Sequence, residues 1–355
     1  MKAPSITLAL TEAFNPGNPL MTQDESRAFT IAPRGTSRQN WIFHHPPVPG
    51  FLSVIIPVYD DREGLETTLT CLARQTLSPT GFEVIIANDG GDPAISELCR
   101  SFAVREVVMK TNRGSYFARN EALAQSRGEF IGLTDADTVP ETNWCEVGRE
   151  LLGAADYVVG LTKVIVSSQR TVCELYQACA DFCSSEQQMA QGSSPTVNLF
   201  VRRTIFEKYG FFDERLRSSG DIEFAARVLA DPTWKSIFSN RLVCGHPPRT
   251  YRQFLRKTTR IIYGQCNILC LYPDWRERFG STFAVSWRRL LPVKRLPRSE
   301  YMALTFWERL AVYFFAWHIK FFSFVIQCRY FWEVSRASST TKTEHLVESR
   351  KRRSE

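Results

Sequence analysis

Short apolar segments alternate with polar turns and with helical patterns from residue 51 onward. Apolar segments bounded by turn residues predict buried strands, and apolar residues that repeat every three or four positions predict helices. The predicted strands cover residues 51–59, 82–87, 104–109 and 129–134, and the predicted helices between them cover residues 65–72, 93–102 and 116–126. This alternation predicts an α/β fold with a mostly parallel sheet that is flanked by helices.

Acidic residues follow three of the predicted strands. Asp60 and Asp61 follow the first strand, Asp89 follows the second, and Asp135 and Asp137 follow the central one. Ligands bind at the carboxyl ends of strands in open α/β sheets, so the three turns are expected to share one crevice. Alternate residues of an extended segment point the same way, so Asp135 and Asp137 can converge. Such a pair suits a hard divalent cation bridged to phosphate, although an isolated pair is more often a surface turn.

Charge and composition narrow the classes of partner. The chain has 355 residues and a net charge of +7, with Arg and Lys concentrated in its second half and at residues 350–353. This asymmetry favours an anionic partner such as a nucleotide diphosphate, a lipid phosphate or a membrane surface. No nucleic-acid-binding module is recognisable, so we expect no nucleic acid partner. Cysteines without C-x2-C spacing and an N-terminus without a signal-peptide pattern predict a reducing, cytoplasmic location.

Neither a G-x-G-x-x-G motif after the first strand nor a P-loop is present, so phosphates would be held by a metal and side chains. Four segments, residues 54–59, 86–91, 118–120 and 133–137, together resemble family 2 glycosyltransferases with a GT-A fold. The resemblance continues through residues 198–214 to Ser219-Gly220-Asp221-Ile222-Glu223-Phe224, which is similar to the G-E-D motif of that family. It covers about residues 51–265 and implies a nucleotide-sugar-dependent transferase, usually of the inverting type.

The resemblance also implies roles for individual residues that bind the donor. Pro57, Tyr59 and Asp89 match positions that hold the nucleoside, with Asp89 on the base. Arg119 matches a position near the base and the phosphates, and Asp135 matches a contact to the ribose or the metal.

Two further residues match a metal site, and a third matches the base. Asp137 matches the metal ligand, and His246 matches a histidine beside the metal and diphosphate, so the implied cofactor is Mn²⁺ or Mg²⁺. Inverting transfer needs a base on the acceptor side and a cation on the side of the departing diphosphate. Asp221 is the candidate base. It also begins a predicted helix over residues 221–229, so it can equally be a capping residue, with Glu223 as the next candidate base.

The chain departs from the family pattern at three positions. Asn88 replaces the first Asp of D-D-G-S, and Gly220 replaces the Glu of G-E-D. Lys257 replaces the Trp of the Q-x-x-R-W motif in processive synthases, which argues against processive polymerisation. On a helix, the arginines between residues 249 and 260 would form one basic stripe, suited to a diphosphate or a lipid-phosphate acceptor.

The segment 305–334 is dense in aromatic residues and long enough to span a bilayer. Lys320 interrupts its middle, at a cost of about 2.5–3.5 kcal/mol for a spanning helix. Lys320, Ser323 and Gln327 are spaced as a narrow polar stripe. This pattern favours a helix in the membrane interface, ahead of a buried helix and of a spanning helix.

The expected organisation has four parts: a loosely ordered arm (1–50), a GT-A-like transferase domain (51–265), a helical aromatic extension (266–335) and a basic tail (336–355). The predicted function is metal-assisted sugar transfer to a hydroxyl acceptor, saccharide or lipid-linked, in glycan or exopolysaccharide assembly. The predicted location is the inner face of the cell membrane, with peripheral contact. The alternatives are a sugar nucleotidyltransferase and a catalytically inactive GT-A-like binding protein.

Overall fold

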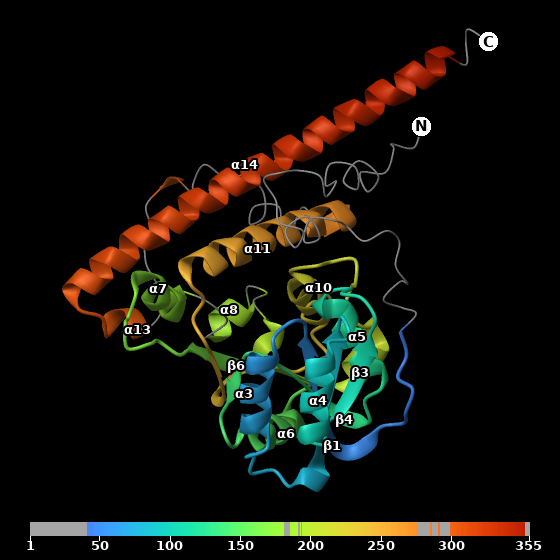
Figure 1. Cartoon of the computed structure of the whole chain (residues 1–355), viewed down its shortest axis with the longest axis vertical. Helices are drawn as coiled ribbons and strands as arrows, with labels where there is room; N and C mark the ends of the chain where they lie inside the picture. The colour runs from blue at the N-terminus through green and yellow to red at the C-terminus, as the bar shows by residue number, and fades with distance from the viewer. Residues whose placement is uncertain are drawn as a thin grey trace.

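A computed structural model describes residues 41–180, 185–190, 192, 194–275, 285, 290–291 and 299–351 of the chain. The predicted α/β alternation is confirmed in the first half of the fold (Figure 1). Its elements, in chain order, are β1 (Val48–Val58), α3 (Arg62–Leu72), β2 (Phe82–Asp89), α4 (Pro93–Ser101), β3 (Arg105–Met109), α5 (Ser115–Ala124) and β4 (Gly128–Leu133). The acidic turns therefore follow β1, β2 and β4, as the sequence predicts.

The second half of the fold mixes strands and helices less regularly. Its elements are β5 (Val139–Pro140), α6 (Trp144–Ala154), β6 (Tyr157–Val164), α7 (Val172–Ala180), α8 (Glu186–Ala190), β7 (Leu199–Arg202), α9 (Arg203–Tyr209), α10 (Gly220–Val228), β8 (Ser236–His246), α11 (Tyr251–Leu271), α13 (Ser299–Met302) and α14 (Phe306–Lys351). Short 3₁₀ turns occur at Pro79–Gly81, Thr196–Asn198 and Pro273–Trp275.

The strands form one eight-stranded sheet in the order β3-β2-β1-β4-β7-β6-β8-β5. The half built from β3, β2, β1 and β4 is parallel throughout. Beyond it, β7 pairs antiparallel with both β4 and β6, β6 and β8 pair in parallel, and β5 closes the edge antiparallel to β8. The sheet is therefore mixed, and its parallel half carries the acidic turns.

Apolar side chains alternate between the two faces of β1, which separates two cores. Ile55 belongs to the core formed with α5, α9 and α10, whereas Leu52, Val54 and Ile56 belong to the core formed with α3, α4 and α6. Strands buried on both faces need near-continuous apolar runs, which is why these segments stand out in the sequence.

The N-terminal arm and the domain boundary differ in detail from the expected division. Residues 1–40 lie outside the described part of the chain. β1 already begins at Val48, and Trp41 and Phe43 pack on the core beside Phe211. The division expected between residues 265 and 266 falls inside α11, so one continuous helix crosses it.

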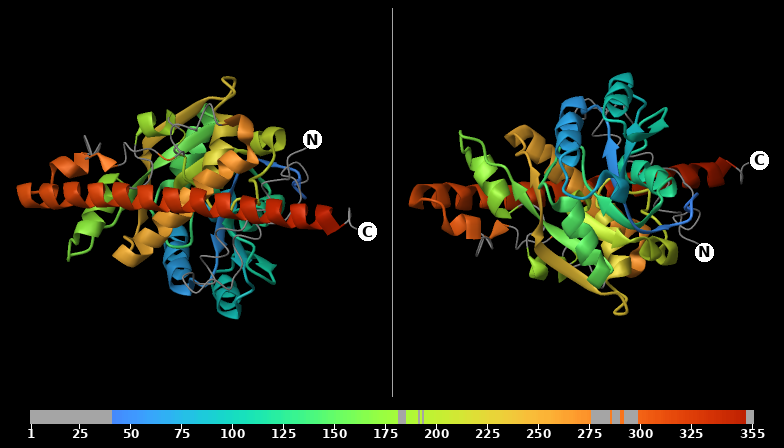
Figure 2. Two further views of the ribbon diagram at one scale, coloured as in Figure 1. Left: turned by 90° about the horizontal axis from the view of Figure 1, so that it is seen from above. Right: turned by 90° about the horizontal axis from the view of Figure 1, so that it is seen from below.

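A helical layer formed by α7, α11 and α14 covers one end of the α/β domain (Figures 1 and 2). In Figure 1 α14 runs above α11, and Figure 2, seen from above and from below, shows that it crosses the whole molecule. The inner face of α14 packs on this layer through Val312, Ile319, Ile326 and Tyr330, all of which are buried.

The outer face of α14 is aromatic and exposed. Phe306 is 70% exposed, Trp307 74% and Phe321 52%. Over Phe306–Val334 the helix is long and apolar enough to cross a membrane, which by itself is weak support for spanning. Lys320 donates to the Leu291 carbonyl at 2.8 Å, so its charge lies against the polypeptide rather than in an apolar layer. Buried packing and an exposed aromatic face thus coexist on one helix.

Candidate active site

A cavity of about 1010 Å³ opens between the carboxyl ends of the parallel strands and α11. Six of the predicted site residues line it: Pro57, Tyr59, Arg119, Asp135, Asp137 and Asp221. His246 and Asp89 are buried and do not line the cavity, and His246 contacts Asp137. The structure therefore brings six of the eight predicted residues to one cavity and His246 to one of its lining residues.

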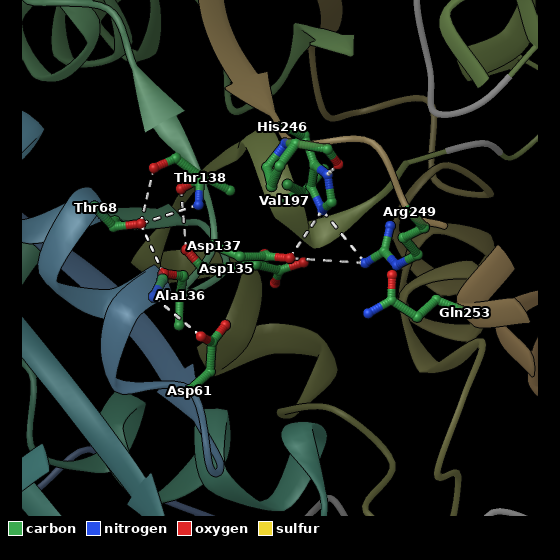
Figure 3. A network of polar contacts seen from close by, with 12 residues as sticks. Asp61, Thr68, Asp135, Ala136, Asp137, Thr138, Val197, His246, Arg249 and Gln253 are labelled. Atoms are coloured by element: carbon green, nitrogen blue, oxygen red, sulfur yellow. Dashed lines mark hydrogen bonds and ion pairs between the residues drawn. The ribbon is translucent and has the colours of Figure 1, made fainter. Parts of the chain in front are cut away.

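Buried threonines hold the turn that carries Asp135 and Asp137 (Figure 3). The Thr68 hydroxyl, on α3, lies 2.8 Å from the carbonyl oxygens of both Ala136 and Thr138, which share its one proton, and it accepts from the Thr138 amide at 2.9 Å. Thr138 in turn donates to the Asp135 carbonyl at 3.0 Å. Sequence analysis missed Thr68, because a lone threonine on a helix gives no signal that distinguishes it from a surface residue.

Arg119 ties the Asp135 carboxylate to α5. The guanidinium of Arg119 is buried and forms an ion pair with Asp135. Its Nε is buried and has no hydrogen-bond partner in the described part of the chain. An arginine has five N–H donors in a fixed fork, so this one retains capacity for an anionic group in the cavity.

Asp137 lies beside His246, the last residue of β8, and Arg249, which follows that strand (Figure 3). His246 Nε2 is 3.4 Å from Asp137 Oδ2, and Arg249 Nη2 is 3.3 Å from His246 Nε2 and 3.9 Å from Asp137 Oδ2. His246 Nδ1 is 2.6 Å from the Pro247 carbonyl, which can only accept, so this nitrogen is assigned the proton. Burial lowers the pKa of His246 despite the nearby Asp137 charge, and this favours the neutral ring. A neutral Nε2 is then an acceptor facing a carboxylate.

Asp221 lines the same cavity from a different element, the first turn of α10. The Tyr116 hydroxyl donates to Asp221 Oδ1 at 3.0 Å, and the Ile222 amide donates to the same oxygen at 3.0 Å. Burial raises the pKa of Asp221, and the bond from Tyr116 partly offsets that rise. Ser219, not Asp221, holds the N-cap position of α10. A carboxylate with a raised pKa beside a cavity has the properties of a general base.

Asp89 has a second use that the sequence did not indicate. Its two carboxylate oxygens accept from the amides of Arg113 and Gly114, both at 2.7 Å, and it is almost completely buried. Burial raises the pKa of Asp89, and the two amide bonds oppose that rise. Asp89 therefore orders the turn before α5, while its predicted contact with the nucleoside base stays a prediction.

The departure at Asn88 has a local cause. The side-chain nitrogen of Asn88 donates to the Glu106 carboxylate at 2.8 Å and to the backbone carbonyl of Asp92 at 2.9 Å. The side-chain oxygen of Asn88 accepts from the backbone amide of Asp92. A second carboxylate at this position would face Glu106 and repel it. Gly90 adopts a φ of +138°, and a Cβ there would lie 3.1 Å from the Tyr59 ring. The turn is therefore shaped to let Tyr59 cover it.

The predicted basic stripe is divided by the helix geometry. α11 begins at Tyr251 after a capping box of Thr250 and Gln253, so Arg249 precedes the helix and Gln253 caps it. Lys257 and Arg260 line the cavity together with Arg249, whereas Arg252 and Arg256 do not. The face of α11 that lines the cavity contains Lys257, Arg260, Ile261 and Gln265, which are spaced as i, i+3, i+4 and i+8.

Only part of a metal-ligand set comes together in the described residues. No group of three or more His, Cys, Asp or Glu that could hold a metal occurs among the residues that the structure describes. Asp137 and His246 form a pair, and Asp135 is engaged by Arg119.

Comparisons with known proteins agree with this geometry. The family model described as "Glycosyl transferase family 2" matches residues 53–208. "Glycosyltransferase AglE" from Haloferax volcanii is 29% identical over 228 residues, which span 62% of this chain and 75% of AglE. "Probable glycosyltransferase YdaM" from Bacillus subtilis is 25% identical over 229 residues, which span 59% of this chain and 54% of YdaM.

A solved structure shares the fold at low sequence identity. It is a mannosyltransferase, PcManGT from Pyrobaculum calidifontis, in complex with GDP-Man and Mn²⁺. The TM-score is 0.52 at 16% identity, and the match covers 91% of this chain and 98% of the other. This similarity confirms the predicted GT-A-like fold. Residues 53–208 therefore match glycosyltransferase family 2, and together with the named glycosyltransferase relatives this match identifies a nucleotide-sugar-dependent glycosyltransferase.

Proposed function

We propose that the protein transfers a sugar from its nucleotide-sugar donor to a hydroxyl acceptor, with Asp221 as general base and a divalent cation beside Asp137. The observation that supports the proposal is that Asp221 on α10 and Asp137 in the turn after β4 line one cavity. Inverting transfer needs a base and a cation at one site, because the acceptor proton leaves on one side of the anomeric carbon and the diphosphate departs on the other.

The properties of Asp221 support its role as the base. Its carboxylate lines the cavity, so an acceptor hydroxyl can reach it. Its pKa is raised by burial, and a raised pKa strengthens a base toward a hydroxyl proton. Glu223, the other candidate in the same helix turn, is buried and paired with Arg227 at 2.7 Å. That ion pair leaves Asp221 as the better candidate.

The metal proposal is supported by the chemistry of the Asp137–His246 pair. Two acceptors 3.4 Å apart repel each other unless a cation or a proton lies near them, and Arg249 supplies that charge here. A neutral imidazole nitrogen and a carboxylate oxygen are both ligands for Mn²⁺. When bound, Mn²⁺ or Mg²⁺ would stabilise the charge of the departing diphosphate. Arg249 is then free to bind a phosphate oxygen, and one of its terminal nitrogens is already buried without a partner among the described residues.

The helical layer formed by α7, α11 and α14 supports a proposal for the acceptor and for the cellular location of the protein. Lys257 and Arg260 present positive charge to the cavity from α11, which packs against α14. The exposed aromatic face of α14 suits the interfacial region of a bilayer. We propose a peripheral protein at the inner face of the cell membrane. Its acceptor is a saccharide or lipid-linked hydroxyl compound in glycan or exopolysaccharide assembly.

The test is donor hydrolysis and transfer by the purified full-length protein, with UDP-, GDP- and other nucleotide sugars screened in Mn²⁺. We expect at least one donor to be consumed, and Asp221→Asn to reduce kcat about 10²–10⁴-fold while donor affinity stays near wild type. Asp92→Asn is the matched control, because Asp92 caps α4 outside the cavity and Asn caps equally well.

Three outcomes would contradict the proposal. An Asp221→Asn variant that matches Asp92→Asn in rate would remove Asp221 from the mechanism. Donor binding without turnover of any sugar in wild-type protein would favour a catalytically inactive binding protein. Diphosphate release from a nucleoside triphosphate would instead indicate a nucleotidyltransferase.

A further inference from the structure

A tyrosine from another helix occupies the space beside the Asp221 carboxylate. Tyr116 lies in the first turn of α5, and its hydroxyl donates to Asp221 Oδ1 at 3.0 Å. The Tyr116 side chain is buried, and its ring packs on Phe212 with ring centroids 5.6 Å apart. The contact therefore joins two elements that are distant in the sequence, and packing fixes the ring that carries the hydroxyl.

The same ring explains why residue 220 is glycine. A Cβ added to Gly220 would lie 2.8 Å from two carbons of the Tyr116 ring and 3.0 Å from a third. Real Cβ atoms essentially never approach a neighbour this closely, so even alanine would displace the ring. The Glu found at this position in the family motif could not be accommodated together with Tyr116.

We propose that Tyr116 is a positioning residue for Asp221, and that Tyr116 and Gly220 together replace the acidic residue of the G-E-D motif. The proposal rests on Asp221 being the base. A hydrogen bond from Tyr116 fixes the rotamer of the Asp221 carboxylate, so one oxygen is held in place and the other is directed to the acceptor. Tyr116 lines the same cavity, and its proposed role is exerted through the Asp221 carboxylate.

The effect of the Tyr116 hydroxyl on the pKa of Asp221 can be measured, and it adds to the effects of the charged groups around Asp221. Besides Tyr116, the cations Arg119 and Arg260 act on the Asp221 carboxylate. Burial raises the pKa of Tyr116 well above its usual range, so its hydroxyl remains a donor at working pH. Removing that donor takes stabilisation from the Asp221 anion, which raises the pKa of Asp221. Activity requires the ionised base, so the acid limb of the rate profile should move to higher pH.

The experiment compares Tyr116→Phe with wild type over pH 5 to 9 in the donor-consumption assay, using the full chain. We expect kcat at neutral pH to fall about tenfold. The midpoint of the acid limb of the pH–rate profile should move up by about one pH unit, because a bond to a charged group is lost. The KM for the donor should change less than twofold. Tyr263→Phe is the matched control, since the Tyr263 hydroxyl donates to the Glu333 carboxylate, also at 3.0 Å, and Tyr263 does not line the cavity.

The proposal is overturned if Tyr116→Phe keeps the wild-type acid limb, whether or not its rate falls. It is also overturned if Tyr263→Phe moves the limb equally. Should Tyr116→Phe fail to fold, Gly220→Ala provides the second test, because its Cβ displaces the same hydroxyl and predicts the same upward shift. Asp221→Asn run in parallel separates the two proposals. If it stays active, the base assignment fails. If it is inactive while Tyr116→Phe is normal, only the role of Tyr116 fails.

Discussion

Replacing Thr68 with valine should loosen the turn that carries Asp135 and Asp137 without changing the shape of the side chain. Thr68 is completely buried on α3. Its hydroxyl shares one proton between two carbonyls of the turn and accepts from the Thr138 amide. Valine has the same volume but neither donates nor accepts, so all three contacts are lost together.

The magnitude follows from the groups left without partners. The Thr138 amide becomes a buried, unsatisfied donor, which costs about 1–3 kcal/mol, and the lost hydroxyl bond adds about 0.5–1.5 kcal/mol. Burying an additional methyl group offsets part of this cost. We therefore expect Thr68→Val to lower the free energy of unfolding by about 2–3 kcal/mol. We also expect donor affinity to fall about tenfold or more, because Asp135 and Asp137 lose their fixed geometry.

Thr70→Val is the control on the same helix. The Thr70 hydroxyl donates to the Glu66 carbonyl one turn earlier, at the exposed surface, so its loss should cost little. Urea unfolding measures the stability difference, and calorimetry with a nucleoside diphosphate and Mn²⁺ measures the affinity. The reasoning is refuted if Thr68→Val and Thr70→Val differ by less than about 0.5 kcal/mol in the free energy of unfolding.

Three further predictions concern the cation, the pH dependence of stability and the membrane. Asp137→Asn should weaken Mn²⁺-dependent nucleoside diphosphate binding at least about tenfold, since an amide lacks the charge that holds a hard cation; unchanged affinity by calorimetry would contradict the metal proposal. Burial raises the pKa of Asp213, but the hydrogen bonds from Arg215 and Tyr272 and the charge of Arg215 lower it by a larger amount. The net shift of the pKa is therefore downward. Stability from this pair is therefore present above the ordinary carboxyl pKa and lost as pH falls through the lowered one. Asp213→Asn should cost about 1.5–3 kcal/mol at pH 7, and urea unfolding near pH 3 should show a smaller difference. Replacing the exposed Phe314 and Phe321 by serine should reduce binding to phosphatidylglycerol vesicles about tenfold in a sedimentation assay, with catalysis retained; equal binding would exclude this face as the membrane contact.

Local patterns in the sequence were enough to predict the parallel half of the sheet and its acidic edge. Strands buried on both faces require continuous apolar segments, and those segments end where polar turns begin. Asp135 and Asp137 stood out because they end such a segment. The family resemblance then placed Tyr59, Arg119 and Asp221 at the same cavity, and the structure agrees that they line it.

Only the tertiary structure decided which side chains complete the site, because contacts between distant segments leave no periodic signal in the sequence. The hydroxyls of Thr68 and Tyr116 reach the site from separate helices, and the Tyr116 ring accounts for Gly220. The helical repeat of α11 turned Arg260 toward the cavity but not Arg256. On α14, packing against α11 and α7 buried one face and left the other aromatic face exposed. Its composition alone could not determine this, since the same residues suit a buried, interfacial or spanning helix.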